Sequence, residues 1–477
     1  MNPILPFVIF SVYFGGFVRH SARVDLTPYR SFLTELAERS GDRRSAAGSS
    51  RGRRTPRVIV DNSALPTYDR RDGALPASVD LVVIGAGVAG AATAYFAARA
   101  GLQVLVIERR SSIASLTTAA ATGAFRLQHD NADELALVQE GLPLYLNFAE
   151  ESGLTGWNLD IRQQGYLFCS RTEASAAKGR DLVALQRTFG LTDVELLSGD
   201  EARARWTYLS PEIRQVRFRA GDGFIDQVAL TNGYAAASSH AAHVSGASGS
   251  GHATYALETT VTGFVRDASG GVTGVTTNRG AVHAPQTVIA AGPWSGLVAK
   301  LAGIDLPIAP TIRQKLVIPN LPVIDQSGPM TIDDETGSHW RPALAGAYAL
   351  RTDPTTPVGE PLLEVPTDEA MAHALLDPDS PTSLALLAPF WRDVWRDGPP
   401  AWRLQAGQYE YTPDHRPFIG PTDQAGLFVN TGYSGHGVMC SAGGARRTVD
   451  LLLGRAAAAE EPFRVGRPMT SRARDVL

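Results

Sequence analysis

Three glycines near one strand-like run have the spacing that binds a diphosphate. Gly85, Gly87 and Gly90 form a GxGxxG pattern within DLVVIGAGVAG, which begins at Asp80. The first suits a tight turn, the second lets backbone approach a pyrophosphate, and the third lets a helix pack closely on a strand. Glu108 lies 18 residues after Gly90, where an acid binds ribose hydroxyls. The pattern predicts a dinucleotide site, and the acid favours FAD or NAD over NADP.

A second glycine-rich turn lies near the other end of the chain. A strand is expected at 426–430, followed by TGYSGHG from Thr431 and by a helix. A β-branched strand also runs into Ala291 and Gly292, another place where backbone can touch a flat or phosphorylated ligand. Two strand-turn-helix units so far apart fit a cofactor that is held at both ends.

A loop of small residues, 111–123, leads to Arg126. Small residues let backbone lie against a flat ligand, and an arginine after them could hold a carboxylate through a bidentate fork. From these residues alone, an ordinary surface arginine is the better interpretation.

The elements around these residues indicate an α/β protein with two lobes. Strands are expected at 79–84 and 103–107 with a helix at 88–100 between them, which is a Rossmann-type unit. An amphipathic helix is expected at 131–152, where Pro143 could kink it. Strands and helices without regular βαβ order then predict a second lobe with a mixed sheet. The expected FAD-binding domain comprises residues 78–160, 255–310 and 405–460, and the expected substrate domain comprises 161–254 and 311–404.

Composition excludes several classes of function. The chain has 477 residues and a formal net charge of −4, which gives no electrostatic case for nucleic acid. Its two cysteines, Cys169 and Cys440, are too few for a disulfide framework. No cysteine, histidine and carboxylate grouping has metal-ligand spacing, so no metal is expected.

Residues 1–77 differ from the rest of the chain. Residues 3–18 are uncharged and apolar, slightly short of the roughly 20 residues that span a bilayer. An arginine-, serine- and glycine-rich run follows at 42–57 and is typical of a flexible linker. A disordered or weakly packed extension is the preferred interpretation and a membrane anchor the alternative. A cytoplasmic location is therefore expected, with membrane association through 3–18 as the secondary expectation.

Four stretches together resemble the FAD-dependent amine and amino-acid oxidoreductases, which include D-amino-acid oxidase, glycine oxidase, sarcosine oxidase and dimethylglycine dehydrogenase. They are DLVVIGAGVAG with Glu108, ATGAFRLQHDN, TVIAAGPWS, and TPDHRPFIGP followed by GYSGHG. The resemblance covers about residues 79–455. It implies a Rossmann-type FAD lobe and a substrate lobe whose mixed sheet covers the flavin.

The resemblance also implies roles for individual residues. It places Arg126 on the substrate carboxylate, as in sarcosine-type oxidases, and makes His436 a second candidate at the reacting centre, although a structural role in the turn is preferred for it. Backbone N–H groups of the second glycine turn would face the flavin N1–C2=O edge. The implied cofactor contacts are Gly85, Gly87, Ala89, Gly90, Glu108, Arg109, Val261, Ala291, Gly292, Gly435, His436, Gly437 and Val438.

The chain departs from the sarcosine oxidase pattern at three places. Gly407 stands where those oxidases carry the cysteine that attaches the flavin, so non-covalent FAD is expected. Met439 replaces a second carboxylate-binding lysine, which leaves Arg341 or Arg313 as alternative sources of that interaction. The lysine that activates oxygen has no counterpart around 345–351.

The predicted reaction is oxidation of a C–N bond in a small amine or amino acid. Hydride passes to flavin N5, and the resulting imine is hydrolysed. The electrons then pass to oxygen or to an electron-transfer acceptor, so oxidase and dehydrogenase activity both stay open. Tyr409 and Tyr433 are expected to line the pocket. The alternatives are a 2-hydroxy-acid dehydrogenase of the same superfamily and a non-catalytic flavoprotein subunit or assembly factor.

Overall fold

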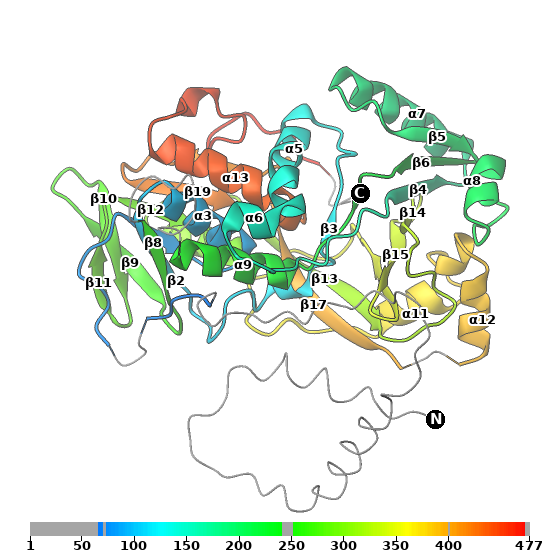
Figure 1. The fold of residues 1–477 in the computed structure, drawn as a ribbon, viewed down its shortest axis with the longest axis horizontal. Coiled ribbons are helices and arrows are strands. Elements are labelled where there is room, and N and C mark those ends of the chain that lie inside the picture. The colour runs from blue at the N-terminus through cyan, green and yellow to red at the C-terminus, as the bar shows by residue number, and fades with distance from the viewer. Residues whose placement is uncertain (1–64, 70–72, 241–250, 399–400, 473–477) are drawn as a thin grey trace, which may run out of the picture. The chain divides into compact units, whose positions relative to one another are not determined.

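A six-stranded sheet forms the first layer of the fold in the computed structural model, which describes residues 65–69, 73–240, 251–398 and 401–472 (Figure 1). Its strand order is β18-β19-β12-β1-β2-β8, and every neighbouring pair is parallel except β18 with β19. The strands are β1 (Leu81–Ile84), β2 (Gln103–Ile107), β8 (His252–Ala256), β12 (Gln286–Ile289), β18 (Phe418–Pro421) and β19 (Leu427–Thr431).

Both faces of this sheet are covered, which explains why its strands are apolar without alternation. Leu81 and Val83 point toward helix α3, whereas Val82 and Ile84 point toward a three-stranded meander. Helices α9 and α13 flank α3. The elements of these layers are α3 (Val88–Arg99), α9 (Gln227–Ser239), α13 (Gly437–Leu452), β9 (Val261–Arg266), β10 (Val272–Thr277), β11 (Gly280–His283), η4 (Gly292–Trp294) and α10 (Ser295–Leu301).

An eight-stranded mixed sheet forms the second layer. Its order is β17-β13-β16-β15-β14-β4-β6-β5, and only β14 and β4 pair in parallel. Trp340 and Trp391 pack in the core between one face and helices α11 and α12. The strands and covering helices are β4 (Tyr166–Ser170), β5 (Glu195–Ser198), β6 (Gln215–Arg219), β13 (Ala309–Ile318), β14 (Met330–Asp333), β15 (Ser338–Ala343), β16 (Gly346–Arg351), β17 (Arg403–Tyr411), α7 (Glu173–Thr188), α8 (Gly199–Arg205), α11 (Ala370–Leu376), η5 (Leu384–Leu386) and α12 (Phe390–Arg396).

Short elements join the two sheets. The helix predicted at 131–152 is in fact two helices that break at Asn147, whose N–H donates to the carbonyl of Pro143. Proline is therefore accommodated inside the first helix, and the break comes one turn later. These elements are α4 (Thr117–Ala120), β3 (Ala124–Phe125), α5 (Ala132–Leu146), α6 (Phe148–Ser152), β7 (Gly223–Phe224) and η6 (Ala458–Glu460).

The predicted fold class is confirmed, since an α/β sheet of Rossmann type stands beside a mixed sheet. The domain boundaries stay a prediction. Helix α9 lies within the predicted substrate segment 161–254 yet packs on α3. Strand β17 lies mostly within the predicted FAD segment 405–460 yet pairs with β13.

The localisation predicted from the sequence was wrong. Within the described ranges, no helix combines the length and apolar character needed to cross a membrane. Residues 3–18, on which the expected membrane association depended, lie outside the described residues. We therefore withdraw both parts of that prediction.

Gly90 provides a test of the packing between α3 and the first glycine turn. A Cβ atom at Gly90 would lie 1.9 Å from the backbone oxygen of Gly85. Gly90→Ala should therefore lower the free energy of unfolding by about 1–3 kcal/mol, despite alanine's better helix propensity. Urea unfolding measures the change. Gly359→Ala is the matched control because a Cβ there meets nothing within 4 Å, and equal stability of the two variants would contradict the close packing.

Candidate functional site

A cavity of about 320 Å³ lies at the carboxyl ends of β1, β2 and β12. Ligands of open α/β sheets bind at this edge of the sheet. The cavity is bordered by both glycine turns, so it joins segments more than 300 residues apart in sequence. The predicted contacts that line it are Gly85, Gly87, Ala89, Glu108, Arg109, Val261, Ala291, Gly292, Gly435, Gly437 and Val438, together with Tyr409 and Tyr433.

The first glycine turn has the geometry of a diphosphate cradle. Gly85 has a φ of +105°, and a Cβ there would lie 2.5 Å from the carbonyl oxygen of Ala290. Gly87 is the N-cap of α3 and lines the cavity, and the first turn of α3 carries no acid. The helix N-terminus therefore presents positive potential to the cavity, and its first N–H group, that of Val88, donates to Thr118 Oγ1 at 3.1 Å. Gly90 does not line the cavity; its contribution is the close packing described above.

Glu108 holds the first turn in place from the end of β2. Its Oε2 accepts a hydrogen bond from Ala86 N–H at 2.9 Å, and its Oε1 accepts one from Arg110 N–H at 2.8 Å. Burial raises the pKa of Glu108, while these N–H donors oppose the rise. Next to it, the guanidinium of Arg109 stacks 4.2 Å from the ring centre of Trp294. This end of the cavity thus offers a carboxylate and a flat cation–aromatic pair, which suit an adenosine.

The second glycine turn closes the opposite end. Gly435 has a φ of +102°, and a Cβ there would lie 2.5 Å from the ring of Tyr409. Helix α13 begins directly after it at Gly437, with His436 as N-cap and no acid in its first turn. Backbone N–H groups and the positive helix end therefore face the cavity, where they would stabilise the negative charge of a reduced flavin if one is bound there. The cavity fits FAD at both ends.

Arg126 and His436, the two predicted substrate-site residues, lie in contact. Arg126 is 6% exposed and follows β3. Its Nη2 donates to His436 Nε2 at 3.3 Å, and His436 Nδ1 lies 3.4 Å from Glu134 Oε1. Because a guanidinium only donates, Nε2 is the acceptor, and the ring proton resides on Nδ1 and is donated to Glu134. The chain Glu134–His436–Arg126 fixes the direction of the guanidinium.

His129 completes this group but adds no charge. Burial lowers its pKa well below the usual range, and the charge of Arg126 lowers it further. The side-chain nitrogen and oxygen atoms of His129, Glu134 and His436 lie within 4.8 Å of one another, and such side chains can bind a divalent transition metal. However, the Arg126 guanidinium donates to His436 and brings positive charge into the same space. We therefore assign the group to the support of Arg126.

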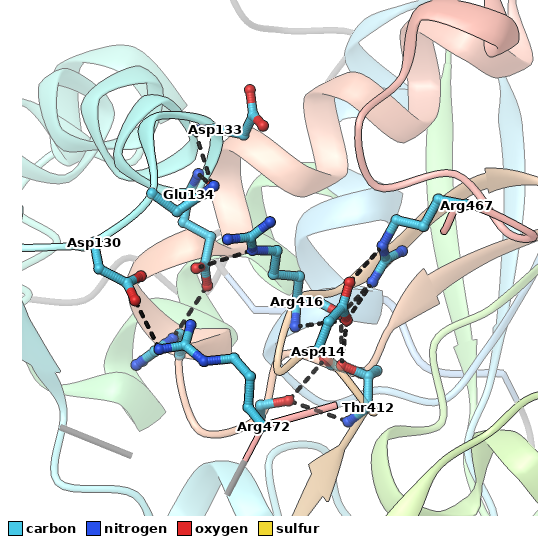
Figure 2. A network of polar contacts seen from close by, with 12 residues as sticks. Asp130, Asp133, Glu134, Thr412, Asp414, Arg416, Arg467 and Arg472 are labelled. Atoms are coloured by element: carbon cyan, nitrogen blue, oxygen red, sulfur yellow. Dashed lines mark hydrogen bonds and ion pairs between the residues drawn. The ribbon is translucent and has the colours of Figure 1, made fainter. Parts of the chain in front are cut away.

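A network of ion pairs encloses Glu134 from the C-terminal side (Figure 2). Arg467 makes a bidentate pair with Asp414, at 2.8 and 2.9 Å, and also donates to the carbonyl oxygen of Arg416. Arg416 in turn lies 4.0 Å from Glu134. Arg472 pairs with Asp130 at 2.6 Å, one residue after His129. The C-terminal segment therefore orders the loop after β17 and the segment that follows Arg126.

Sequence reasoning missed several residues of the site. Glu134 lies in the first turn of α5, where an acid is ordinary because it suits the helix dipole. Glu410 lines the cavity but lies within a strand pattern that gives no sign of what it faces. The one available signal was QHDN after Arg126, a polar run directly after a buried strand.

Comparisons with known proteins agree with this geometry. A family model described as FAD dependent oxidoreductase matches residues 80–451. D-amino acid dehydrogenase of Cereibacter sphaeroides is 27% identical over 436 residues, which cover 79% of this chain and 92% of that protein. Glycine oxidase from Geobacillus kaustophilus has a TM-score of 0.69 at 22% identity and covers 83% of this chain and 100% of that one. L-proline dehydrogenase from P. horikoshii has a TM-score of 0.68 at 23% identity, with coverages of 82% and 96%.

The two structural likenesses support the fold, and the family match spans both glycine turns and the segment that contains Arg126. The chain belongs to the FAD-dependent oxidoreductase family.

Proposed function

We propose that this FAD-dependent oxidoreductase oxidises the C–N bond of a small carboxylated amine or amino acid to an imine, which water hydrolyses. The observation that carries the proposal is Arg126, a buried cation with no carboxylate partner among the described residues, held beside the turn that closes the cofactor cavity. A guanidinium in that state suits a carboxylate. FAD, when bound, supplies the hydride acceptor.

The protein's own groups have three tasks in this reaction. Arg126 would orient the substrate through its carboxylate, and Glu134 and His436 keep its guanidinium directed. The aromatic side chains of Tyr166, Phe168 and Phe224 form an apolar wall near Arg126. Such a wall excludes water and favours the neutral amine, since desolvation disfavours the charged form. No general base is required for hydride removal from a neutral amine.

The named relatives favour the amine over the alternatives. D-amino acid dehydrogenase and glycine oxidase are names of proteins that act on amino acids. Neither name is that of a hydroxy-acid dehydrogenase or of a non-catalytic subunit. Amino acids and amines are therefore the substrates to test first.

The structure offers support for a non-covalent cofactor. A Cβ at Gly407 would lie 2.8 Å from the Cβ of Ala120, so a side chain there would require Ala120 to shift. Cys169 and Cys440 are free, buried and absent from the cavity lining. We propose that FAD is held by contacts alone.

Glu410 is a carboxyl group within the cofactor cavity that no sequence pattern singles out. It lines the cavity on β17, and a Cβ at Gly292 would lie 3.8 Å from its Oε2. Burial raises its pKa to about 7, against the opposing N–H groups of Glu410 and Tyr433. Burial raises the pKa of Tyr409 and of Tyr433, and the negative charge of ionised Glu410 raises both further. Near neutral pH, FAD would therefore meet a mixture of neutral and ionised Glu410.

This titration predicts that FAD affinity falls as pH rises. The carboxyl is neutral below its folded-state pKa and ionised above it, and a carboxylate repels the pyrophosphate in the same cavity. The FAD dissociation constant should rise by up to about tenfold per pH unit above pH 7 and stay flatter in Glu410→Gln. Calorimetric titration from pH 6 to 8.5 measures it, with exposed Glu364→Gln as the control. An equal rise in Glu410→Gln and the parent protein would place the titrating group elsewhere.

Substituting Arg126 tests the carboxylate contact. Arg126→Gln should raise the KM for a carboxylated amine by about 10–100-fold, because a charge-assisted bidentate contact is lost. The effect on an amine that lacks a carboxylate should be much smaller. Steady-state kinetics on such a matched pair measures the difference. An unchanged KM for the carboxylated amine would remove Arg126 from the substrate site.

The electron acceptor is proposed as either oxygen or an electron-transfer acceptor. An anaerobic screen of amines and hydroxy acids should bleach the flavin absorbance with amines and leave it unchanged with hydroxy acids. Admitting oxygen to the bleached sample should restore the yellow colour within seconds for an oxidase and far more slowly for a dehydrogenase. If every amine leaves FAD-reconstituted protein oxidised, the non-catalytic alternative replaces this proposal.

A further inference from the structure

Two buried cations share the face of the eight-stranded sheet that points away from α11 and α12. Lys315 on β13 is 2% exposed, and Arg341 on β15 is 9% exposed. Across the described ranges, neither forms an ion pair with a carboxylate; their recorded partners are backbone oxygens and aromatic rings. Burying an unpaired charge is expensive. The pair therefore points to an anion that the chain itself does not supply.

Both cations contact the ring of Tyr348, which lies on β16 between their two strands, and both retain donors for such an anion. The Nζ atom of Lys315 and the guanidinium of Arg341 lie 4.3 and 4.7 Å from the ring centre of Tyr348. Lys315 donates to the carbonyl of Ala121 at 2.8 Å, and Arg341 donates to that of Thr122. An ammonium has three N–H donors and a guanidinium five. Each side chain therefore keeps at least one donor for a further acceptor.

A row of aromatic rings connects this pair with Arg126. The rings are Phe168, Tyr166 and Phe224, with neighbouring centres 6.0 and 6.5 Å apart. Arg126 lies 5.8 Å from the ring of Phe168, and Arg341 lies 4.6 Å from that of Phe224. The row thus has a guanidinium at each end.

Tyr166, the middle ring, brings a hydroxyl group into this row. It is 3% exposed, and its hydroxyl forms no hydrogen bond with any residue that the structure describes. Burial raises its pKa, and the charges of Arg126 and Arg341 both oppose that rise. The hydroxyl therefore lies within the field of both cations and is free to bond a ligand between them.

We propose that Arg341 and Lys315 bind a second acidic group of the substrate, so that the preferred substrates are amino acids or amines with two carboxylates. This inference rests on the proposed function, because Arg126 takes the carboxylate next to the amine. The second carboxylate then lies at the far end of the aromatic row. This carboxylate supplies the negative charge that no described residue provides for Arg341 and Lys315.

The pKa of Lys315 is that of a buried cation without an anionic partner among the described residues. Burial, and to a smaller extent the charges of Arg341 and Arg403, lower its pKa from 10.5 to about 7. A carboxylate between Lys315 and Arg341 acts in the opposite direction and favours the charged ammonium.

Binding without turnover gives the first test. FAD-reconstituted protein is titrated with succinate and glutarate, with propionate and butyrate as single-acid counterparts, and with inorganic phosphate. Flavin absorbance changes and thermal shift are the readouts. The dicarboxylates should bind at least tenfold more tightly than the matched monocarboxylates. Equal affinities, or phosphate that stabilises the protein as much as glutarate does, would overturn the proposal.

Variants of Lys315 separate a ligand contact from a structural role. Lys315→Met should bring the ratio of dicarboxylate to monocarboxylate affinity close to one, and Lys315→Arg should restore it. Lys178→Met is the matched control, because Lys178 is exposed on α7. A purely structural role predicts that Lys315→Met lowers the unfolding temperature while the affinity ratio stays unchanged, and that result would refute the proposal. Arg341→Lys gives an independent variant that keeps the buried charge.

Turnover gives the second test and distinguishes failure of the dicarboxylate preference from failure of the proposed function. Both enantiomers of aspartate, glutamate and 2-aminoadipate are compared with alanine, 2-aminobutyrate and norvaline. The acidic amino acids should show a kcat/KM at least tenfold higher, with an optimum at one chain length. Flavin reduction by both groups without preference would reject the inference and leave the proposed function standing. Selective binding of dicarboxylates without flavin reduction by any amine would reject the proposed function and leave the binding of an acidic group at Arg341 and Lys315 supported.

Discussion

The closeness of backbone to backbone around the first glycine turn is the constraint on which the cofactor cavity depends. Neither Gly85 nor Gly90 has room for a Cβ, because the chain segments after β1 and β12 meet there and α3 packs directly on the turn. That contact places the N-terminus of α3 at the edge of the sheet. It also determines where Glu108 can reach, since its carboxylate accepts from Ala86 within the same turn. A side chain at either glycine would separate the layers that form the cavity.

The proposed substrate end, around Arg126, depends on a different kind of interaction. Arg126, His436 and Glu134 come from the segment after β3, the turn before α13 and the first turn of α5, and they meet only in the folded chain. Each is buried or nearly so, and therefore each needs the others as hydrogen-bond partners. The C-terminal ion pairs of Arg467 and Arg472 hold the loop after β17, whose Arg416 lies 4.0 Å from Glu134, and the segment that follows Arg126 (Figure 2). Positioning at this end thus comes from polar contacts between distant segments.

These two kinds of interaction explain what the sequence could predict. The cofactor turn is local: strand, glycines, helix and acid follow one another within 30 residues, so spacing alone predicts the fold of β1, α3 and β2. The resemblance to a family then located Arg126 and the turn at Gly435. Glu134 could not be found in this way, because an acid in the first turn of a helix is common and its partner lies 302 residues away. Lys315 and Glu410 were missed for a different reason: β-strand patterns do not show which face meets a ligand.

The balance of charge links Arg126 with the pair formed by Arg341 and Lys315. Arg126, Arg341 and Lys315 are buried without carboxylate partners within the described residues, so the unliganded protein carries an electrostatic cost that an anion relieves. A lysine can reduce that cost by releasing its proton, and the lowered pKa of Lys315 shows this tendency. Arginine has no comparable escape at neutral pH. The two arginines therefore keep the site cationic at neutral pH. Because the cost is present before substrate binds, part of the binding energy of an acidic substrate comes from relieving it, and a neutral analogue cannot obtain that part.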